Sequence, residues 1–389
     1  MIKLIETVEN EQQAREQIQV LSPAFHSQIK GVIEIELQSL GFPDISASCW
    51  HQPDDFHKNV EGYEDVFARV KTEKDGKCKF HFNADFFPNG PISLKFLGVN
   101  ADGIEDVSYL QLINLGGEKW RKGAKNTANP PQTEGMKLVF CDDFDGKLNI
   151  TRNGDNGSYM SHTPWWGDFG DAGFEDFDSK FNPFSIEDDT FLCISAKKHE
   201  EYAEIDKHKR PYVGGIISQV NSKGEGFTAK MGYFEARMLC PPGLGTWPAF
   251  WLMSQRQLLD KTIGFSSELD VLEEYGRQPH IVHMVQHLWD SRPEGIKGKG
   301  VHKSDTYDLV EMGLGDSVQT FHTYGCKITE DEVIYYIDNV PTKRHPTDEM
   351  SKGPMYFLID LALGPGWKVE LDRYGNDVRL FVDYVRIYE

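Results

Sequence analysis

The chain has 389 residues, of which 41 are basic and 61 are acidic, giving a formal charge of −20 at neutral pH. A charge of this sign repels polyanions, so the composition argues against binding to nucleic acid or to an anionic lipid surface. It also disfavours a heavily sulfated galactan, unless Lys or Arg gathers locally at the binding site. No continuous apolar run reaches the ~18 residues of a transmembrane helix, so we expect no membrane insertion.

The first 130 residues are predicted to form a small, mainly β accessory domain. Four segments alternate or cluster apolar residues as short strands do, namely 31–37, 66–70, 79–82 and 92–96. Residues 9–20 could form a short helix. Two roles stay open for the domain: it binds carbohydrate through a stacking face, or it supports the second domain and keeps the same aromatics in its core. The aromatics concerned are Trp50, Phe56, Phe86, Phe87 and Trp120.

A second domain is predicted over residues 136–389. Just before it, residues 117–135 are rich in Gly, Asn, Lys, Pro and Thr, as linkers are. The domain begins with a strand-like segment at 136–146 and continues in short strand-like runs separated by Gly, Pro and Asn turns. With little helical periodicity, this pattern predicts an all-β sandwich.

The most informative segment is 268–273, which reads Glu-Leu-Asp-Val-Leu-Glu. In an extended strand Glu268 and Asp270 share one face, whereas Glu273 would point to the other. A β-bulge that inserts one extra residue near Val271 would return Glu273 to the acidic face. The segment therefore predicts three carboxyls on one surface. The alternative is a half-exposed strand whose polar face simply meets water.

Three carboxyls on one surface suit retaining glycoside hydrolysis. One carboxylate attacks the anomeric carbon, while a second, about 5–5.5 Å away, protonates the leaving oxygen. A third carboxyl between them can share a proton with the nucleophile, and its charge raises the pKa of the acid.

Several sequence blocks surround the acidic segment in a fixed order: Phe234–Arg237, a Gly-rich turn at 241–245, an aromatic strand at 246–252, and later blocks at 321–325, 335–339, 354–358 and 381–388. Together they resemble glycoside hydrolase family 16, the group that contains laminarinases, lichenases, agarases and carrageenases. The resemblance runs from about residue 136 to residue 389. It implies a β-jelly roll whose two curved sheets form an open cleft, which suits internal cleavage of long chains.

Carried onto this sequence, the resemblance makes Glu268 the nucleophile, Asp270 the auxiliary carboxylate and Glu273 the general acid/base. Glu268 would form a covalent glycosyl-enzyme while Glu273 protonates the departing oxygen, and Glu273 would then deprotonate water. The anomeric configuration is retained. The bulged Glu-x-Asp-x-x-Glu spacing is similar to that of laminarinases and agarases, and it differs from the unbulged spacing of plant xyloglucan transglycosylases and Bacillus lichenases.

Aromatic and imidazole side chains near the acidic segment are candidates for substrate binding. Trp247 and Trp251 are four apart on one strand and share a face, opposite Phe250. The resemblance gives Trp247 a sugar-stacking role, whereas Trp251 could equally belong to the core. His283 and His287 would lie about 13 Å apart on one strand, too far for one metal ion. His287 is the better cleft candidate, a satisfied surface histidine being the alternative.

Three further residues are assigned to substrate binding. Arg237 lies with Glu235 on the strand before the Gly-rich turn, and we expect Glu235 to form a surface ion pair. Trp165 and Trp166 lie in a loop flanked by Gly and acidic residues, where they either line a subsite or pack against the rim.

No nucleotide-binding motif is present, so no cofactor is expected. The resemblance allows a structural calcium ion remote from the chemistry, with Asp142, Asp143 and Asp383 as oxygen ligands, although nothing resembles an EF-hand loop. Six cysteines lie singly, without metal-like spacing. They predict buried thiols rather than a disulfide framework.

The expected partner is a polysaccharide, and we expect a monomer located outside the cell. The N-terminus lacks the apolar stretch of a secretory signal. Three explanations stay open: the leader has been removed, the protein leaves its cell by a leaderless route, or it is a phage-borne depolymerase released by lysis.

Three functions remain. The first is an endo-acting retaining hydrolase of a β-1,3 or mixed-linkage glucan, or of a glucan-containing exopolysaccharide, with a galactan or another bacterial exopolysaccharide as the alternative substrate. The second is a non-catalytic glucan-binding protein, which usually lacks the catalytic glutamates. The third is a transglycosylase, which the bulged spacing disfavours. Linkage and sugar type depend on loops such as 153–178 and 290–317, whose conformations one sequence does not give.

Overall fold

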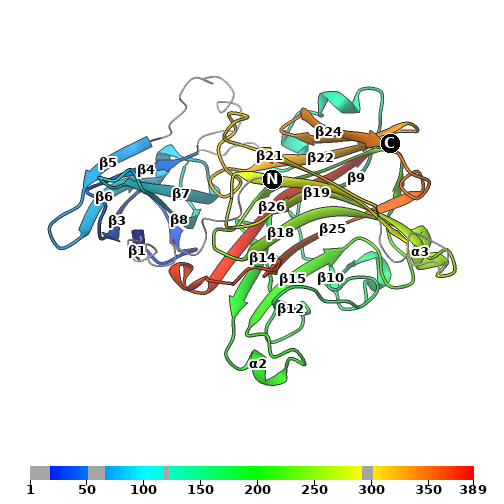
Figure 1. The fold of residues 1–389 in the computed structure, drawn as a ribbon, viewed down its shortest axis with the longest axis horizontal. Helices are drawn as coiled ribbons and strands as arrows, with labels where there is room; N and C mark the ends of the chain where they lie inside the picture. The colour runs from blue at the N-terminus through cyan, green and yellow to red at the C-terminus, as the bar shows by residue number, and fades with distance from the viewer. Residues whose placement is uncertain (1–17, 51–65, 118–121, 291–300) are drawn as a thin grey trace. The chain divides into compact units, whose positions relative to one another are not determined.

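The computed structural model describes residues 18–50, 66–117, 122–290 and 301–389 (Figure 1). The chain divides into two compact units, residues 1–120 and residues 121–389, which we call unit 1 and unit 2. The described regular structure consists almost entirely of strands, which confirms the predicted all-β class. Within the described ranges, no helix has the length and apolar character needed to cross a bilayer.

Unit 1 contains two sheets. The smaller is antiparallel, in the order β1 (Ile18–Ser22), β3 (Val32–Ser39), β6 (Lys77–Asn83). The larger has the order β2 (Gln28–Ile29), β8 (Glu105–Asn114), β7 (Gly90–Val99), β4 (Asp44–Cys49), β5 (Val66–Lys71). The described part of the unit also contains the short 3-10 helix η2 (Ala84–Phe86). The four predicted strands correspond to β3, β5, β6 and β7. The predicted helix is wrong for residues 18–20, which belong to β1, while residues 9–17 lie outside the described ranges.

Apolar alternation explains why these strands pack together. On β6 the side chains of Cys78, Phe80 and Phe82 are buried and alternate with more exposed neighbours, as a strand with one covered face requires. The ring of Phe67 on β5 lies 5.8 Å from that of Phe80 and 5.0 Å from that of Phe82. These contacts join the two sheets of unit 1 into one core.

Three of the aromatics considered either for a carbohydrate-stacking face or for the core of unit 1 lie in the described residues. Trp50 and Phe87 are buried in the core, and only Phe86 is exposed. Burying these rings in the core stabilises the fold more than leaving them exposed to solvent would. Phe56 and Trp120 lie outside the described residues.

Unit 2 is a sandwich of two sheets. The back sheet contains β9 (Leu138–Asp142), β12 (Ala172–Phe174), β13 (Phe184–Glu187), β14 (Phe191–Lys198), β17 (Tyr233–Leu239), β22 (His322–Ile328), β23 (Glu332–Ile337), β24 (Val340–Pro346) and β26 (Asp377–Tyr388). The cavity sheet contains β10 (Ile150–Thr151), β11 (Tyr159–Met160), β16 (Ala229–Lys230), β18 (Thr246–Ser254), β19 (Phe265–Glu274), β20 (Ile281–Asp290), β21 (Val301–Asp308) and β25 (Pro354–Leu363).

One strand joins the two sheets of unit 2. β15 (Tyr212–Ser218) pairs with β14 of the back sheet and with β25 of the cavity sheet. From β25 the cavity sheet continues through β18, β19 and β20 to β21, and Figure 1 shows β15, β25, β18 and β19 side by side. The short helices of unit 2 are α2 (Tyr202–Ile205), α3 (Arg256–Leu259), η3 (Ala124–Asn126), η4 (Pro131–Thr133), η5 (Asp155–Gly157) and η6 (Asp372–Tyr374).

The core of unit 2 lies between the sheets. The ring of Phe357 on β25 lies 5.9 Å from that of Phe140 on β9 and 6.2 Å from that of Phe250 on β18. The hydroxyl of Tyr335 on β23 donates a hydrogen bond of 3.0 Å to the carbonyl of Val285 on β20. These contacts leave the opposite face of the cavity sheet available for a site and confirm the predicted β-jelly-roll sandwich.

Residues 122–135 fold as part of unit 2 and not as the linker that their composition suggested. Gly123 donates its backbone N–H to Asp383 at 2.9 Å, and Lys327 donates to the carbonyl of Gln132 at 2.7 Å. Gly123 has a φ of +74°, and a Cβ there would lie 2.9 Å from the Asp143 carboxyl, so glycine is required by close approach. The polar composition of the segment therefore reflects hydrogen bonding to the sheet.

The cysteines largely follow the expectation of buried thiols. Five of the six are buried, while Cys141 is exposed on β9.

Candidate active site

A β-bulge interrupts β19 in the middle of the acidic segment. Leu272 pairs with Phe250 of β18 and Asp270 pairs with Trp251, so Val271 is an extra residue on β19. The pairing of β19 with β20 shifts at the same place, between Asp270 and Glu273. The bulge predicted from the five-residue spacing is therefore confirmed.

The bulge returns Glu273 to the face that carries Glu268 and Asp270. All three carboxyls line one cavity of about 190 Å³, whose other lining residues are Trp165, Phe169, Trp247, Ala249, Trp251 and Asp360. Between the three acids, Leu269 and Val271 are fully buried. Their burial in the core fixes the direction in which the acids point.

The carboxyl of Glu268 accepts a hydrogen bond from an indole. Trp289 Nε1 donates a hydrogen bond of 2.7 Å to Glu268 Oε2. Burial, with the charge of Asp270 second, raises the pKa of Glu268 to about 8, and the donor from Trp289 opposes this rise by favouring the ionised form. Glu268 is therefore a carboxyl that releases its proton reluctantly.

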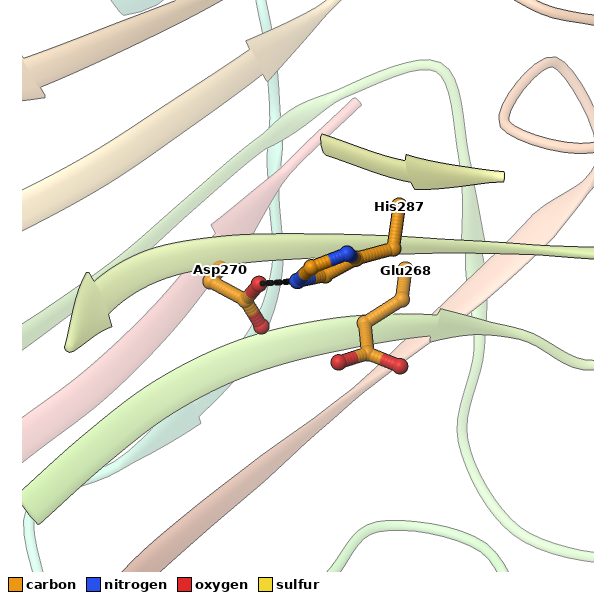
Figure 2. Close-up of side chains that lie close together, drawn as sticks. All are labelled: Glu268, Asp270 and His287. Atoms are coloured by element: carbon orange, nitrogen blue, oxygen red, sulfur yellow. Dashed lines mark ion pairs between the residues drawn. The ribbon is translucent and has the colours of Figure 1, made fainter. Parts of the chain in front are cut away.

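Asp270 lies between the cavity and β20. Its Oδ2 is 3.1 Å from Nε2 of His287, the ion pair drawn in Figure 2, and Glu268 lies beside this pair. Burial, and then the charge of Glu273, raises the pKa of Asp270 well above its usual range. The imidazole of His287 stacks on Trp289, with ring centroids 5.2 Å apart, and its Nδ1 contacts Nδ1 of His302. The imidazole of His287 therefore lies beside the carboxyls of Asp270 and Glu268.

Glu273 has a matching indole donor. Trp247 Nε1 donates a hydrogen bond of 2.9 Å to Glu273 Oε1. Burial raises the pKa of Glu273 above its usual value, against the opposing effect of Trp247. Beyond Glu273, the ring of His283 packs on Tyr275 at 4.5 Å, and burial lowers the pKa of His283. Glu268 and Glu273 therefore each accept from a tryptophan on a neighbouring strand.

Aromatic rings form the other walls of the cavity. The ring of Trp165 lies 6.0 Å from Trp251, and the ring of Phe169 lies 5.3 Å from Trp247. Trp247 and Trp251 share the cavity face, as their spacing predicted, and Phe250 points into the core. Trp251 belongs to the hydrophobic core, being only 5% exposed, and it also lines the cavity.

The loop that carries Trp165 and Phe169 is held in place by polar contacts. Gly167 donates its N–H to Thr163 Oγ1 at 2.8 Å, and Asp168 forms an ion pair with Arg210 at 3.4 Å. Trp165 is 45% exposed, which leaves a ring face available beside the cavity.

Trp166 does not line the cavity. Its φ is +60°, in the left-handed region, and it is not among the residues that line the cavity. The ring lies 5.1 Å from that of His162 and 5.3 Å from the guanidinium of Arg152. Of the two predicted roles, Trp166 therefore takes packing against neighbouring side chains and not the cavity wall.

Arg237 and Glu235 do not lie at the cavity either. Both are on β17 of the back sheet, where Arg237 Nη1 contacts Asp383 Oδ2 at 2.9 Å. Glu235 is fully buried and accepts a hydrogen bond of 2.8 Å from Arg386 Nε. The predicted substrate contact of Arg237 and the predicted surface ion pair of Glu235 are both wrong. Proximity in sequence to the cavity strand did not reveal that the turn at 241–245 passes from one sheet to the other.

The three carboxylates considered as calcium ligands each have a protein partner. Asp142 accepts from Tyr159, Asp143 accepts from the backbone of residue 124, and Asp383 is neutralised by Arg237. In the part of the chain that the structure describes, one group could hold a metal ion, namely Glu268, Asp270 and His287, whose ligand atoms lie within 4.8 Å of one another. Its members already bind each other or Trp289.

Four cavity or near-cavity residues were not among the predicted site residues: Phe169, Ala249, Trp289 and Asp360. Asp360 carries the clearest sequence signal, since it is a single carboxyl in the otherwise apolar run 356–363. Trp289 lies two residues beyond His287 on β20 and so shares its face, a parity that the sequence contains.

Comparisons with known proteins agree with this geometry. Residues 188–374 match the family model described as Glycosyl hydrolases family 16. The chain is 30% identical over 207 residues to Endo-1,3-1,4-beta-glycanase EglC of Rhizobium meliloti (strain 1021), covering 53% of this chain and 40% of that protein. It is 23% identical over 364 residues to Glucan endo-1,3-beta-glucosidase A1 of Niallia circulans, covering 89% of this chain and 48% of that protein. The chain thus spans less than half the length of both relatives.

The fold is shared with solved structures. The laminarinase catalytic domain from Thermotoga maritima MSB8, solved in complex with cetyltrimethylammonium bromide, superposes with a TM-score of 0.51 at 22% identity, covering 65% of this chain and 98% of that chain. Within unit 2, residues 188–374 therefore match the model of glycosyl hydrolases family 16, and the fold is that of the laminarinase structure.

Proposed function

We propose that unit 2 is an endo-acting, retaining glycoside hydrolase that cleaves a β-1,3 or mixed-linkage glucan, or an exopolysaccharide containing such a glucan. The observation that carries the proposal is the bulge at Val271, which sets Glu268, Asp270 and Glu273 on one cavity wall. The family match and the endo-glucanase names of the relatives support the same class of reaction.

In the proposed mechanism Glu268 attacks the anomeric carbon and Glu273 protonates the leaving oxygen. The N–H of Trp289 stabilises the ionised form of Glu268. The raised pKa of Glu273 keeps a proton available for the leaving group. In the second displacement Glu273 takes a proton from water, which releases the sugar from Glu268 with its configuration retained.

Charge repulsion explains how the two glutamates differ in protonation. Three buried carboxyls in one cavity oppose each other's ionisation, so they titrate as a group. The reactive form has Glu268 ionised and Glu273 protonated, while burial and the charge of Glu273 raise the pKa of Asp270 between them. The charge of Asp270 thus raises the pKa of Glu268 beside it.

The aromatic walls would hold the sugar chain. Ring faces of Trp165, Trp247 and Trp251 border the acids, and flat apolar rings pack well against the C–H faces of sugars. Internal cleavage is part of the proposal because a long chain would have to extend beyond a cavity of about 190 Å³ on both sides.

The remaining parts of the proposal follow from this chemistry. The reaction needs no cofactor, because side chains supply the nucleophile, the acid and the base. The protein acts outside the cell, where polysaccharides of this size are found, and it works as a monomer, because the three carboxyls and the aromatic walls come from one chain.

A digestion panel of laminarin, lichenan, agarose, carrageenan and bacterial exopolysaccharides, analysed by product mass, tests the substrate. Proton NMR of the first product gives the anomeric configuration. We expect mixed oligosaccharides from a glucan, with the β-configuration appearing first. Binding without turnover would support a non-catalytic glucan-binding protein, and products longer than the substrate would support a transglycosylase.

Substitution tests the assigned residues. Glu268→Gln and Glu273→Gln should each lower kcat by orders of magnitude while the circular dichroism spectrum stays that of the wild type. Glu200→Gln, at a side chain 84% exposed on unit 2, is the matched control and should leave kcat unchanged. Wild-type turnover in either cavity variant would refute the mechanism.

A further inference from the structure

A fourth carboxyl, Asp360, lines the same cavity, and the proposed reaction does not use it. Asp360 lies on β25 and is 0% exposed. Its Oδ1 accepts a hydrogen bond of 2.8 Å from Trp251 Nε1. Among the described residues no hydrogen-bond donor reaches its Oδ2. One oxygen of a buried carboxyl is therefore left for a ligand to satisfy.

The sheet register places Asp360 beside the catalytic acids. Ala249 of β18 pairs with Glu273 on one side and with Asp360 on the other. The three residues thus form a row across the cavity sheet, with Glu273 and Asp360 two strand spacings, about 10 Å, apart in the backbone. The methyl side chain of Ala249 is the smallest in this row and leaves the space above it open between the two carboxyls.

The hydrogen bond from Trp251 decides what Asp360 can offer to a ligand. Burial raises the pKa of Asp360 well above its usual range; the hydrogen bond from Trp251 and the backbone N–H of Ala362 oppose the rise, and the charge of Glu273 adds to it. A protonated carboxyl has one O–H donor, and because Oδ1 accepts from the indole, the proton belongs on Oδ2. A neutral carboxyl in an apolar site can donate a hydrogen bond at neutral pH, as in other enzymes that hold such an acid.

We propose that Asp360 Oδ2 binds one hydroxyl group of the sugar that lies over Trp251, and that this contact selects which sugar occupies that subsite. The inference rests on the proposed function, since it assumes a carbohydrate in the cavity. A buried donor left without its acceptor carries a desolvation penalty, so a sugar that lacks or misplaces the hydroxyl binds less well. Asp360 is thus a specificity-determining residue of the cavity.

The test measures binding in the Glu268→Gln protein, in which substrate is not consumed. The probes are laminaritetraose and a set of its monodeoxy analogues, each lacking one hydroxyl, with Kd measured by calorimetry. With Asp360 present, one analogue should bind about 10-fold more weakly than the full sugar. In Asp360→Leu the full sugar should bind as weakly as that analogue, and the difference between the two should disappear, as a double-mutant cycle requires for a direct contact.

Asp360→Asn is the second variant, and it keeps the test decisive if Asp360→Leu does not fold. Its amide oxygen can still accept from Trp251 while its N–H replaces the Oδ2 proton, so dependence on the same hydroxyl should persist. Loss of that dependence in Asp360→Asn, or its survival in Asp360→Leu, would overturn the inference. If the parent protein binds no oligosaccharide from any polysaccharide of the digestion panel, both the inference and the proposed function fail, whereas binding that ignores Asp360 removes the inference alone.

Discussion

Trp289 and Glu268 are joined by a hydrogen bond of 2.7 Å from the indole N–H to a carboxylate oxygen. The bond connects neighbouring strands, since Trp289 is on β20 and Glu268 on β19. In a cavity where burial raises the pKa of Glu268 to about 8, this donor favours the ionised form that nucleophilic attack needs.

Trp289→Phe should therefore raise the pKa of Glu268 further and move the acidic limb of the kcat/KM profile to higher pH. We expect kcat/KM at pH 6 to fall roughly 10-fold, the usual effect of removing a hydrogen bond to a charged group. Trp166→Phe, at a ring on the same unit that does not line the cavity, is the control. An unchanged acidic limb in Trp289→Phe would contradict the role given to the indole.

Asp270→Asn should shift the acidic limb of the kcat/KM profile to lower pH, opposite to the shift expected for Trp289→Phe. The charge of Asp270 raises the pKa of Glu268, so its removal lets Glu268 ionise at lower pH. The acidic limb of kcat/KM should move to lower pH, while kcat at the optimum falls because the ion pair of Asp270 with His287 is lost. A shift toward alkaline pH, measured across pH 4–9, would show that Asp270 does not act through its charge.

Glu268→Gln should change how stability depends on pH. A carboxyl whose folded pKa is raised binds more protons when folded, so its contribution to stability is present below about 4.5 and is lost as the pH rises toward about 8. The wild type should lose unfolding free energy across this window more steeply than Glu268→Gln. Urea denaturation at pH 5 and pH 8 measures the effect, and parallel losses in the two proteins would argue against a raised pKa.

Trp165→Ala and Trp166→Ala should differ in their effect on KM, because only one of the two neighbouring rings lines the cavity. Trp165 lines the cavity beside Trp251, whereas Trp166 packs on His162 and Arg152. Loss of one stacking ring should raise KM on polysaccharide about 5- to 10-fold in Trp165→Ala and less than 2-fold in Trp166→Ala. Equal effects on KM would mean that the cavity wall extends to both rings.

Glu235→Ala should affect stability and not chemistry. Glu235 and Arg386 are both buried in the back sheet, and removing one partner of a buried pair costs about 3–5 kcal/mol of unfolding free energy. Glu332→Ala, which breaks an exposed pair with Arg344, should cost less than about 1 kcal/mol. KM well below the melting temperature should stay at the wild-type value in both variants, and a raised KM in Glu235→Ala would connect the back sheet to the site.

The two-residue alternation of side chains along a strand was sufficient to predict the geometry of the acidic segment from the sequence. The period of two along a strand, with the five-residue spacing of Glu268 and Glu273, required an extra residue near Val271, and the bulge is there. The same parity placed Trp247 and Trp251 on one face and Phe250 on the other. Such inferences succeed because they depend only on the pleat of one strand.

Inferences about which surface a residue faces were less secure. Arg237 was assigned to the cavity because it precedes the Gly-rich turn, yet that turn crosses from the back sheet to the cavity sheet. Trp165 and Trp166 are adjacent in the sequence, yet Trp165 lines the cavity and Trp166 packs on His162. Asp360 lies about 90 positions from the acidic segment and reaches it only through the register of β18 with β19 and β25.

The order of side chains along each strand, and therefore the chemistry of the acidic face, was determined by the sequence itself, because covalent geometry fixes that order. The tertiary structure alone decided which strands became neighbours and which polar groups were sealed from water. Strand pairing joins segments far apart in the chain, and whether a carboxyl such as Asp360 or Glu235 is solvated or buried depends on everything that packs around it.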